Sequence, residues 1–351
     1  MKKNKLFLIC FLAIITVILI LVNDESIIVE NLYSNNIYKL ISKSLRLVFG
    51  WIYFSIGDIL YFLFLLSIIY CLTFKINSIK KNYQNYLVVI LFVIISFYMF
   101  WGLNYKRVSI SNKLKLNTEF KKSDLINFTK SAILEINEKH LEIFGSDSTI
   151  PTNKYDFEKS VKISVENIKD LKNSNIGEFV NINYEYTSVK KSIFSKLLTY
   201  MGFSGYINPF TNEANINTKI PQSDLIFVIN HEISHQLGVA KESEANFLAY
   251  NLLINSKNDY LKFCGLNYAL KLSLGELSKI DYSIYSFFFN QINNGVTKEY
   301  INTSKFWKKY DGNIEKISKK TYDFYLRRNN VDSGLQNYNE SLSLILNYKK
   351  E

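Results

Sequence analysis

Residues 231–238, His231-Glu232-Ile233-Ser234-His235-Gln236-Leu237-Gly238, form the most informative pattern in the sequence. In an α-helix, side chains four positions apart lie on one face, so His231 and His235 can direct their imidazoles at one point. Two neutral imidazoles at this spacing suit Zn²⁺, and the carboxylate of Glu232 is positioned to act as general base on a metal-bound water. The chain has only 3 histidines, which makes chance placement improbable. The motif therefore predicts one zinc ion per chain.

An apolar stripe supports the helix itself. It lies roughly 200° around the helix from the two histidines, at about 100° per residue, and consists of Leu225, Ile229, Ile233 and Leu237. One face of the helix can therefore be buried in a core while the other carries the metal.

The third ligand is expected on the next helix. Gly238 is typical of a helix C-terminus, where a residue takes positive φ, and apolar spacing predicts a second helix over residues 241–253. An antiparallel return that starts near Lys241 would bring Glu244 level with the metal about one turn later, so we favour Glu244. Glu242 is the alternative ligand or a residue that supports the ligands. A third histidine at position 241 would give a metzincin-like motif, but the lysine found there, when protonated, cannot bind a metal.

Three apolar runs precede this region, at residues 6–22, 59–74 and 86–103. Each is near the length needed to cross a bilayer, which predicts three membrane spans. The lysine-rich residues 2–5 before the first run would also suit a signal peptide. No small-residue cleavage site follows Val22, so an anchor is expected.

Flanking charges predict the orientation of these spans. Lysines precede the first span and lie between the second and third, as Lys75, Lys80 and Lys81, which places both segments in the cytoplasm. We therefore expect a membrane region over residues 1–105 and an extracytoplasmic domain over residues 106–351, with the lipid bilayer as a partner. Asp58 opens the second span and is expected at the outer interface, as an acidic group at a helix N-terminus.

Charge and cysteine content exclude some classes of function. The net charge of +11 is spread along the chain without clustered basic residues or a known module, which argues against nucleic-acid binding. Two of the three cysteines, Cys10 and Cys71, fall in the apolar runs, and only Cys264 lies beyond them. The extramembrane part can therefore form neither an internal disulfide nor a cysteine zinc site.

The extramembrane part is expected to be α+β, mostly helical with a small sheet. Periodicity predicts a helix over residues 123–144, on which His140 is expected at the surface, a strand over 180–186 and a short helix over 193–201. The segment Gly205-Tyr206-Ile207-Asn208-Pro209-Phe210 fits an edge strand that could hold a peptide substrate by β-augmentation. An ordinary hairpin arm facing solvent is the alternative.

Several separated segments resemble one known family. They are Ser55-Ile56-Gly57-Asp58, Trp101-Gly102-Leu103-Asn104-Tyr105, residues 205–211, His231-Glu232 and Glu244-Ala245-Asn246-Phe247. Over nearly its full length the chain resembles the bacterial membrane family called domain-of-unknown-function 3810. That resemblance implies a membrane-anchored, zincin-like metallopeptidase domain without a stated substrate. The Glu-Ala-Asn segment is also similar to the third-ligand segment of gluzincin-type peptidases, which implies Glu244, although its gap from His235 is shorter than in most gluzincins.

The sequence thus predicts a membrane-anchored zinc peptidase that hydrolyses peptides or proteins outside the cytoplasm. Glu232 would be the general base, and Tyr206, Tyr250 or Tyr338 could stabilise the oxyanion. A non-catalytic, zinc-stabilised receptor of the envelope and a zinc amidase acting on cell-wall peptides are the alternatives. An intramembrane protease is excluded because the apolar run before the motif, residues 225–229, is too short to span a bilayer.

Overall fold

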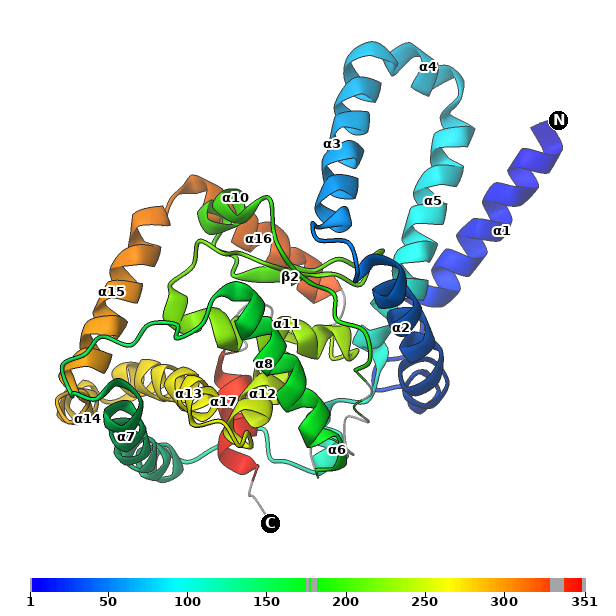
Figure 1. The fold of residues 1–351 in the computed structure, drawn as a ribbon. Helices are drawn as coiled ribbons and strands as arrows, with labels where there is room; N and C mark the ends of the chain where they lie inside the picture. Colours follow the sequence, from blue (N-terminus) through cyan, green and yellow to red (C-terminus); the bar gives the residue numbers. More distant parts are fainter. Residues whose placement is uncertain (1, 175–176, 178–181, 183, 329–337, 349–351) are drawn as a thin grey trace.

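Two kinds of helix follow from the distribution of apolar residues in this chain. The computed structural model describes residues 2–174, 177, 182, 184–328 and 338–348. Long apolar helices project from a rounded body that is built of amphipathic helices and a small sheet (Figure 1). The expected α+β architecture, mostly helical with a small sheet, is confirmed.

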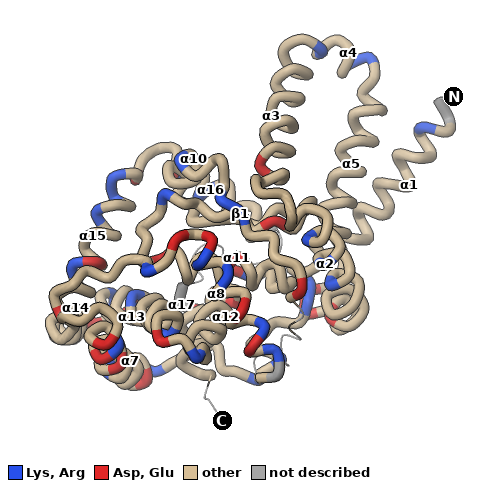
Figure 2. Tube along the Cα trace, viewed as in Figure 1, with Lys and Arg blue, Asp and Glu red and all other residues tan. Residues whose placement is uncertain are grey.

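The N-terminal part contains the projecting helices. Its elements are α1 (Lys2–Ile20), the π-helical η1 (Val29–Ile37), α2 (Tyr38–Phe49), α3 (Ile56–Phe74), α4 (Ile76–Lys81) and α5 (Tyr83–Phe100). Helices α3 to α5 form a hairpin, and α1 packs against α5 (Figure 1). Lys5 Nζ donates a hydrogen bond to Asn85 Oδ1 over 2.9 Å, so the first turn of α1 lies beside the first turn of α5, next to α4. The lysines of both segments therefore lie at the end of the helices far from the body (Figure 2).

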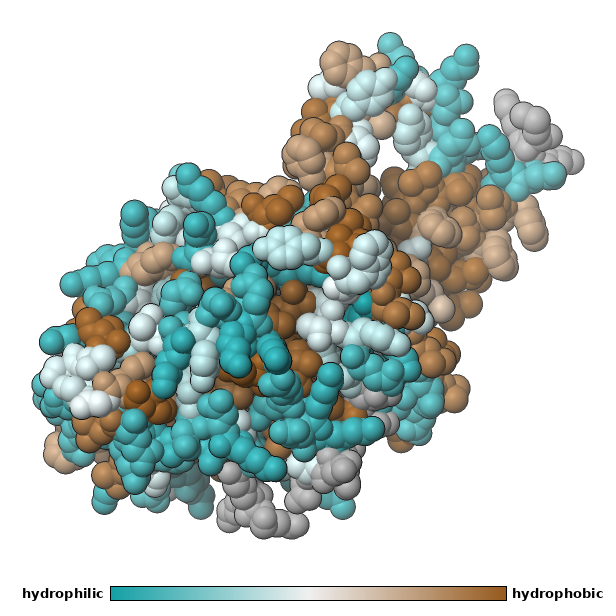
Figure 3. Space-filling model, viewed as in Figure 1, coloured by the Kyte–Doolittle hydropathy of each residue, from teal (hydrophilic) through white to brown (hydrophobic). Residues whose placement is uncertain are grey.

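Two helices, α3 and α5, are long and apolar enough to cross a membrane. Their side chains are almost entirely unburied, as Figure 3 shows for the hairpin, which is unlike the core helix of a soluble protein. The apolar part of α1, Asn4–Ile20, is shorter than these two. The prediction of three spans is thus supported for two of them, and the first remains a prediction.

The body contains the remaining elements. Its α-helices are α6 (Ile110–Leu114), α7 (Lys122–Phe144), α8 (Phe157–Asp170), α10 (Ser195–Met201), α11 (Leu225–Gln236), α12 (Glu242–Ile254), α13 (Asp259–Ile280), α14 (Tyr282–Phe289), α15 (Asn294–Tyr310), α16 (Asn313–Arg328) and α17 (Tyr338–Asn347). Short 3₁₀ turns are η2 (Gly102–Lys106), η3 (Leu171–Asn173) and η4 (Gln222–Asp224). The strands are β1 (Val189–Lys191), β2 (Gly205–Ile207) and β3 (Ala214–Ile216).

Helix α11 is the centre of the body. It packs against β3 on one side and against α8, α12 and α13 on others. The predicted apolar stripe is buried, with Ile229 and Ile233 fully so and Leu225 and Leu237 nearly so. The strand order is β1-β3-β2, with β1 parallel and β2 antiparallel to β3. The sheet thus lies directly beside the motif helix.

Two local predictions differ from the structure. Residues 182 and 184–186, the described part of the segment predicted as a strand, are not in one; the rest of that segment lies outside the described residues. His140 is fully buried on α7, not at the surface. Its Nε2 lies 2.8 Å from the Thr149 carbonyl and its Nδ1 lies 3.2 Å from Asn293 Nδ2. Both ring nitrogens thus have hydrogen-bond partners inside the protein, which allows the ring to be buried although its sequence neighbours are charged.

The base of α3 is held in the body by two carboxylates. Glu213 accepts hydrogen bonds from the backbone N–H groups of Ile56 (3.1 Å) and Gly57, at the N-terminus of α3. Asp58 is fully buried, and its carboxylate accepts hydrogen bonds from Ile193 N (2.7 Å) and the Tyr206 hydroxyl. The expectation that Asp58 lies at a helix N-terminus is confirmed, but it lies inside the body and not at an exposed interface.

Contacts also cross the expected boundary at residue 105. On α2, Tyr38 is fully buried and receives a 3.0 Å hydrogen bond from Asn212 Nδ2, and Ser42 Oγ donates to the Gln236 carbonyl over 3.0 Å. Arg46 Nε donates to the Tyr186 carbonyl over 2.9 Å. The segment before the hairpin therefore supports the C-terminal end of α11.

A buried ion pair supports the turn after α11. Arg107 donates to Glu30 through Nε (2.9 Å) and Nη2 (2.8 Å), and its Nη1 donates to the Gly238 carbonyl over 2.8 Å. Lys113 adds a second cation to Glu30. Burial would raise the pKa of Glu30, but Arg107 and Lys113 outweigh it and lower the pKa to about 2.

We predict that Glu30→Gln destabilises the protein by about 3 kcal/mol at pH 7, because it leaves a buried guanidinium unpaired. A carboxylate whose pKa is lowered on folding stabilises the protein above its ordinary pKa, 4.5, and this contribution is lost as pH falls toward about 2. The difference between wild type and variant should shrink over that window, as measured by thermal unfolding in detergent. Glu166→Gln, which removes only an exposed 3.9 Å pair with Lys162, should change stability by less than about 0.5 kcal/mol. An equal effect of the two variants would contradict the account.

Candidate metal centre

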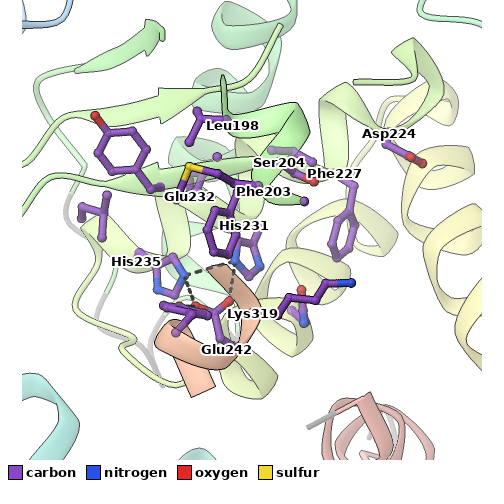
Figure 4. Close-up of a pocket in the computed structure, with 18 of the residues that line it drawn as sticks. Leu198, Phe203, Ser204, Asp224, Phe227, His231, Glu232, His235, Glu242 and Lys319 are labelled. Atoms are coloured by element: carbon purple, nitrogen blue, oxygen red, sulfur yellow. Dashed lines mark hydrogen bonds and ion pairs between the residues drawn. The ribbon is translucent and has the colours of Figure 1, made fainter. Parts of the chain in front are cut away.

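Three side chains from two consecutive helices meet at one point of the body. His231 and His235 on α11 direct their Nε2 atoms at each other and at the carboxylate of Glu242, the first residue of α12 (Figure 4). The two Nε2 atoms lie 3.1 Å apart. Glu242 Oε2 lies 3.1 Å from His231 Nε2, and its Oε1 lies 3.6 Å from His235 Nε2.

These separations fit a tetrahedral metal site. Three ligand atoms at about 2.0–2.2 Å from Zn²⁺ would lie about 3.3 Å from one another. The three measured distances fall on both sides of that value. Two imidazole nitrogens, one carboxylate and an open side facing a cavity also match the donor set of catalytic zinc sites.

The tautomer of His235 suits a ligand. Its Nδ1 lies 2.7 Å from the Val239 carbonyl, which can only accept, so Nδ1 carries a hydrogen and Nε2 is the ring nitrogen left to face the cluster. Trp101 packs edge-on against the ring at 6.0 Å between centroids. For His231, Nδ1 has no partner among the described residues.

Glu242 is oriented by a tyrosine from a distant helix. The Tyr322 hydroxyl on α16 donates a hydrogen bond to Glu242 Oε1. Burial would raise the pKa of Glu242, but the charges and hydrogen bonds of His235 and His231 outweigh it, and the pKa lies well below its ordinary value. The group is therefore a carboxylate, the form that binds cations.

Glu244 lies outside this cluster, so the geometry differs from the ligand set that we favoured from the sequence. Its Oε1 accepts a 2.8 Å hydrogen bond from Ile110 N, and burial raises its pKa against the opposing charge of Lys241. The reason is that the chain turns back after α11 within fewer residues than expected. Gly238 has φ +87°, as predicted, and α12 begins at Glu242, already beside the histidines. Two positions further along, a side chain points about 200° away around the helix.

Glu232 lies next to the cluster on the cavity wall. It is buried, its Oε2 has no hydrogen-bond partner among the described residues, and burial raises its pKa to about 6. A Cβ atom on Gly205 would lie 2.6 Å from Glu232 Oε1, so only glycine lets β2 pass so close. A carboxylate in this position can accept a proton from a group in the cavity.

The cluster opens into a cavity of about 1120 Å³. Its lining includes residues of α3, α5, α10, β2, α11, α12, α13, α16 and α17, and Figure 4 shows Phe203, Phe227 and Lys319 around the two histidines. Among the predicted substrate-binding residues, Gly205, Tyr206, Ile207, Pro209 and Phe210 line it. Asn208 does not: it is fully buried, and its Oδ1 accepts from Phe210 N.

The three tyrosines considered for the oxyanion are placed differently. Tyr206 lines the cavity, but its hydroxyl donates to Asp58. Tyr250 on α12 does not line the cavity; it packs against two clusters of buried apolar side chains, one that includes Ile229 and one that includes Ile226. The side chain of Tyr338 lies outside the described residues. Sequence reasoning missed Tyr322, because no local pattern links α16 to a glutamate 80 positions away.

Comparison with protein families matches the chain to the family described as Protein of unknown function (DUF3810), over residues 33–346. The chain belongs to the DUF3810 family. The resemblance seen in the sequence is thereby confirmed at the level of the family. Comparison with curated proteins and with solved structures gives no match. The match spans the α3–α5 hairpin, α11 and the whole candidate metal centre.

Proposed function

We propose that this DUF3810 protein is a membrane-anchored zinc peptidase of the zincin-like, gluzincin type, acting outside the cytoplasm. The observation that carries the proposal is the convergence of His231, His235 and Glu242 on a cavity whose wall also holds Glu232. His231, His235 and Glu242 would hold the ion, with Glu242 in place of Glu244. A zinc ion bound there would act as a Lewis acid, which lowers the pKa of water and polarises the carbonyl of the substrate.

The residues of the chain have separate roles in this proposal. Glu232 accepts a proton from the attacking water and passes it to the leaving amine. Tyr322 fixes the orientation of Glu242 through its hydrogen bond. The open edge of β2 holds the peptide in an extended conformation beside Glu232, since Gly205 lies against that carboxylate.

The proposed location is supported by the position of the lysines. Lys5 and the lysines of α4 lie at one end of the apolar helices, and the body lies at the other (Figure 2). Because lysines favour the cytoplasmic side, we infer a cytoplasmic N-terminus, three spans that include α1, and an extracytoplasmic body.

Cleavage of a peptide library by the purified full-length protein in detergent tests the function. We expect products in mass spectra of the wild type, loss of products after removal of metal by a chelator, and recovery on addition of Zn²⁺. Metal binding without cleavage of any peptide would instead favour the receptor alternative, and cleavage confined to cell-wall peptides would favour the amidase.

A further inference from the structure

The cavity lies between the body and the foot of the apolar hairpin. Tyr61, Phe62 and Leu65 of α3 line one part of the cavity, and Phe194 and Leu197, at α10, line an adjacent part. Phe62 and Phe194 contact each other with ring centroids 6.5 Å apart. These lining residues are apolar and partly exposed to the outside: the exposed fraction of the residue is 47% for Phe62, 54% for Leu65 and 50% for Leu197. One side of the cavity therefore continues onto the surface of a helix long and apolar enough to span a membrane.

Strand β2 is tied to that same helix. The Tyr206 hydroxyl donates to Asp58, and the Tyr206 ring stacks on Tyr61 at 5.9 Å and 25°. Since Glu213, next to β3, also binds the N-terminus of α3, the sheet and the helix form one rigid corner. The position of β2 relative to α3 is thereby fixed.

The backbone of β2 has an unused edge in the part of the chain that the structure describes, where β3 is its sole neighbour. The Ser204 carbonyl accepts from Asn217 N (2.9 Å) and Asn208 N donates to the Glu213 carbonyl (2.9 Å). Hydrogen bonding alternates along an antiparallel strand, so the N–H and C=O groups of Gly205 and Ile207 point to the open edge. That edge borders the cavity beside Glu232.

We propose that the substrate is a membrane-anchored polypeptide, whose chain leaves the bilayer along Phe62 and Leu65 of α3, enters the cavity and pairs with β2. This inference rests on the proposed peptidase function. A lipid alone offers no peptide backbone groups for Gly205 and Ile207, and a water-soluble peptide has no membrane helix to pack along α3 beside Phe62 and Leu65. An anchored polypeptide provides both, with its extended segment crossing the metal centre directly outside the membrane.

Matched variants on α3 test the inference in nanodiscs. Two probes share one sequence that the library shows to be cleaved, and only one carries a membrane helix of about 20 leucine and alanine residues. Phe62→Ala should lower kcat/KM about tenfold for the anchored probe and less than about twofold for the free one. Phe64→Ala removes an equally exposed ring that does not line the cavity and should change neither. Equal losses for the two probes, or no loss with Phe62→Ala, would overturn the inference.

A second arm does not depend on hydrolysis. Benzoylphenylalanine in place of Leu65 should crosslink, on irradiation, to a short alanine–serine segment attached to the same membrane helix, whereas at Leu66, outside the cavity lining, it should not. Crosslinking at Leu65 without hydrolysis by the wild type would retain the docking site and refute the peptidase. Hydrolysis of free peptides with crosslinks at Leu65 to phospholipid only would retain the peptidase and refute an anchored substrate.

Discussion

The Glu232→Gln variant should bind zinc as the wild type does and hydrolyse peptides about 10²–10⁴-fold more slowly. Glutamine has the shape of glutamate, so it fits beneath Gly205, where a larger side chain would collide with β2. It cannot accept the proton that the carboxylate accepts. The loss should appear in kcat, because Glu232 is proposed to act in the chemical step and not in binding.

A control for this variant is Glu276→Gln. Glu276 also lines the cavity, but its carboxylate pairs with Lys279 at 3.0 Å and lies outside the metal cluster. Its replacement should change the rate by less than about threefold. An unchanged rate for Glu232→Gln, measured with the peptide that the wild type cleaves fastest, would remove Glu232 from the mechanism.

The second large effect is expected in metal affinity. Glu242→Gln should weaken zinc binding by at least about 100-fold, because it replaces an anionic ligand with a neutral amide. Glu244→Gln should retain zinc, since its side-chain oxygen can still accept the hydrogen bond from Ile110 N. Competition with a zinc-binding dye measures both affinities on the full-length protein.

The two glutamates are a matched pair, because both belong to the first turn of α12 and both are acidic. Loss of zinc from Glu244→Gln with retention in Glu242→Gln would contradict the geometry described here. Loss from both would indicate that the first turn of α12 depends on Glu244 for its position. Circular dichroism and thermal unfolding of each variant separate that case from direct ligation.

Sequence reasoning succeeded where the signal is local. The spacing of His231 and His235, the apolar stripe of α11 and the positive φ of Gly238 each depend on a few neighbouring residues. The edge strand β2 beside the helix and the two apolar helices α3 and α5 follow from patterns of the same kind.

The rest depends on tertiary structure. The number of residues in the turn after Gly238 determines which carboxylate of α12 reaches the histidines. A difference of one or two residues changes the answer, and a helix start cannot be predicted from sequence to within one or two residues. The contacts Tyr322–Glu242 and Tyr206–Asp58 join segments 80 and 148 positions apart. Local sequence patterns do not indicate such contacts. The sequence therefore predicts Asp58 at the membrane interface, although Asp58 fixes the sheet to α3.

We propose that His231, His235 and Glu242 together bind one divalent metal ion. Anomalous diffraction at the zinc edge, from crystals of full-length protein purified without chelator, tests it directly. We expect a single peak about 2.0–2.2 Å from both Nε2 atoms and from the Glu242 carboxylate. A peak beside Glu244, or two histidines in the positions described here with no metal between them, would contradict it.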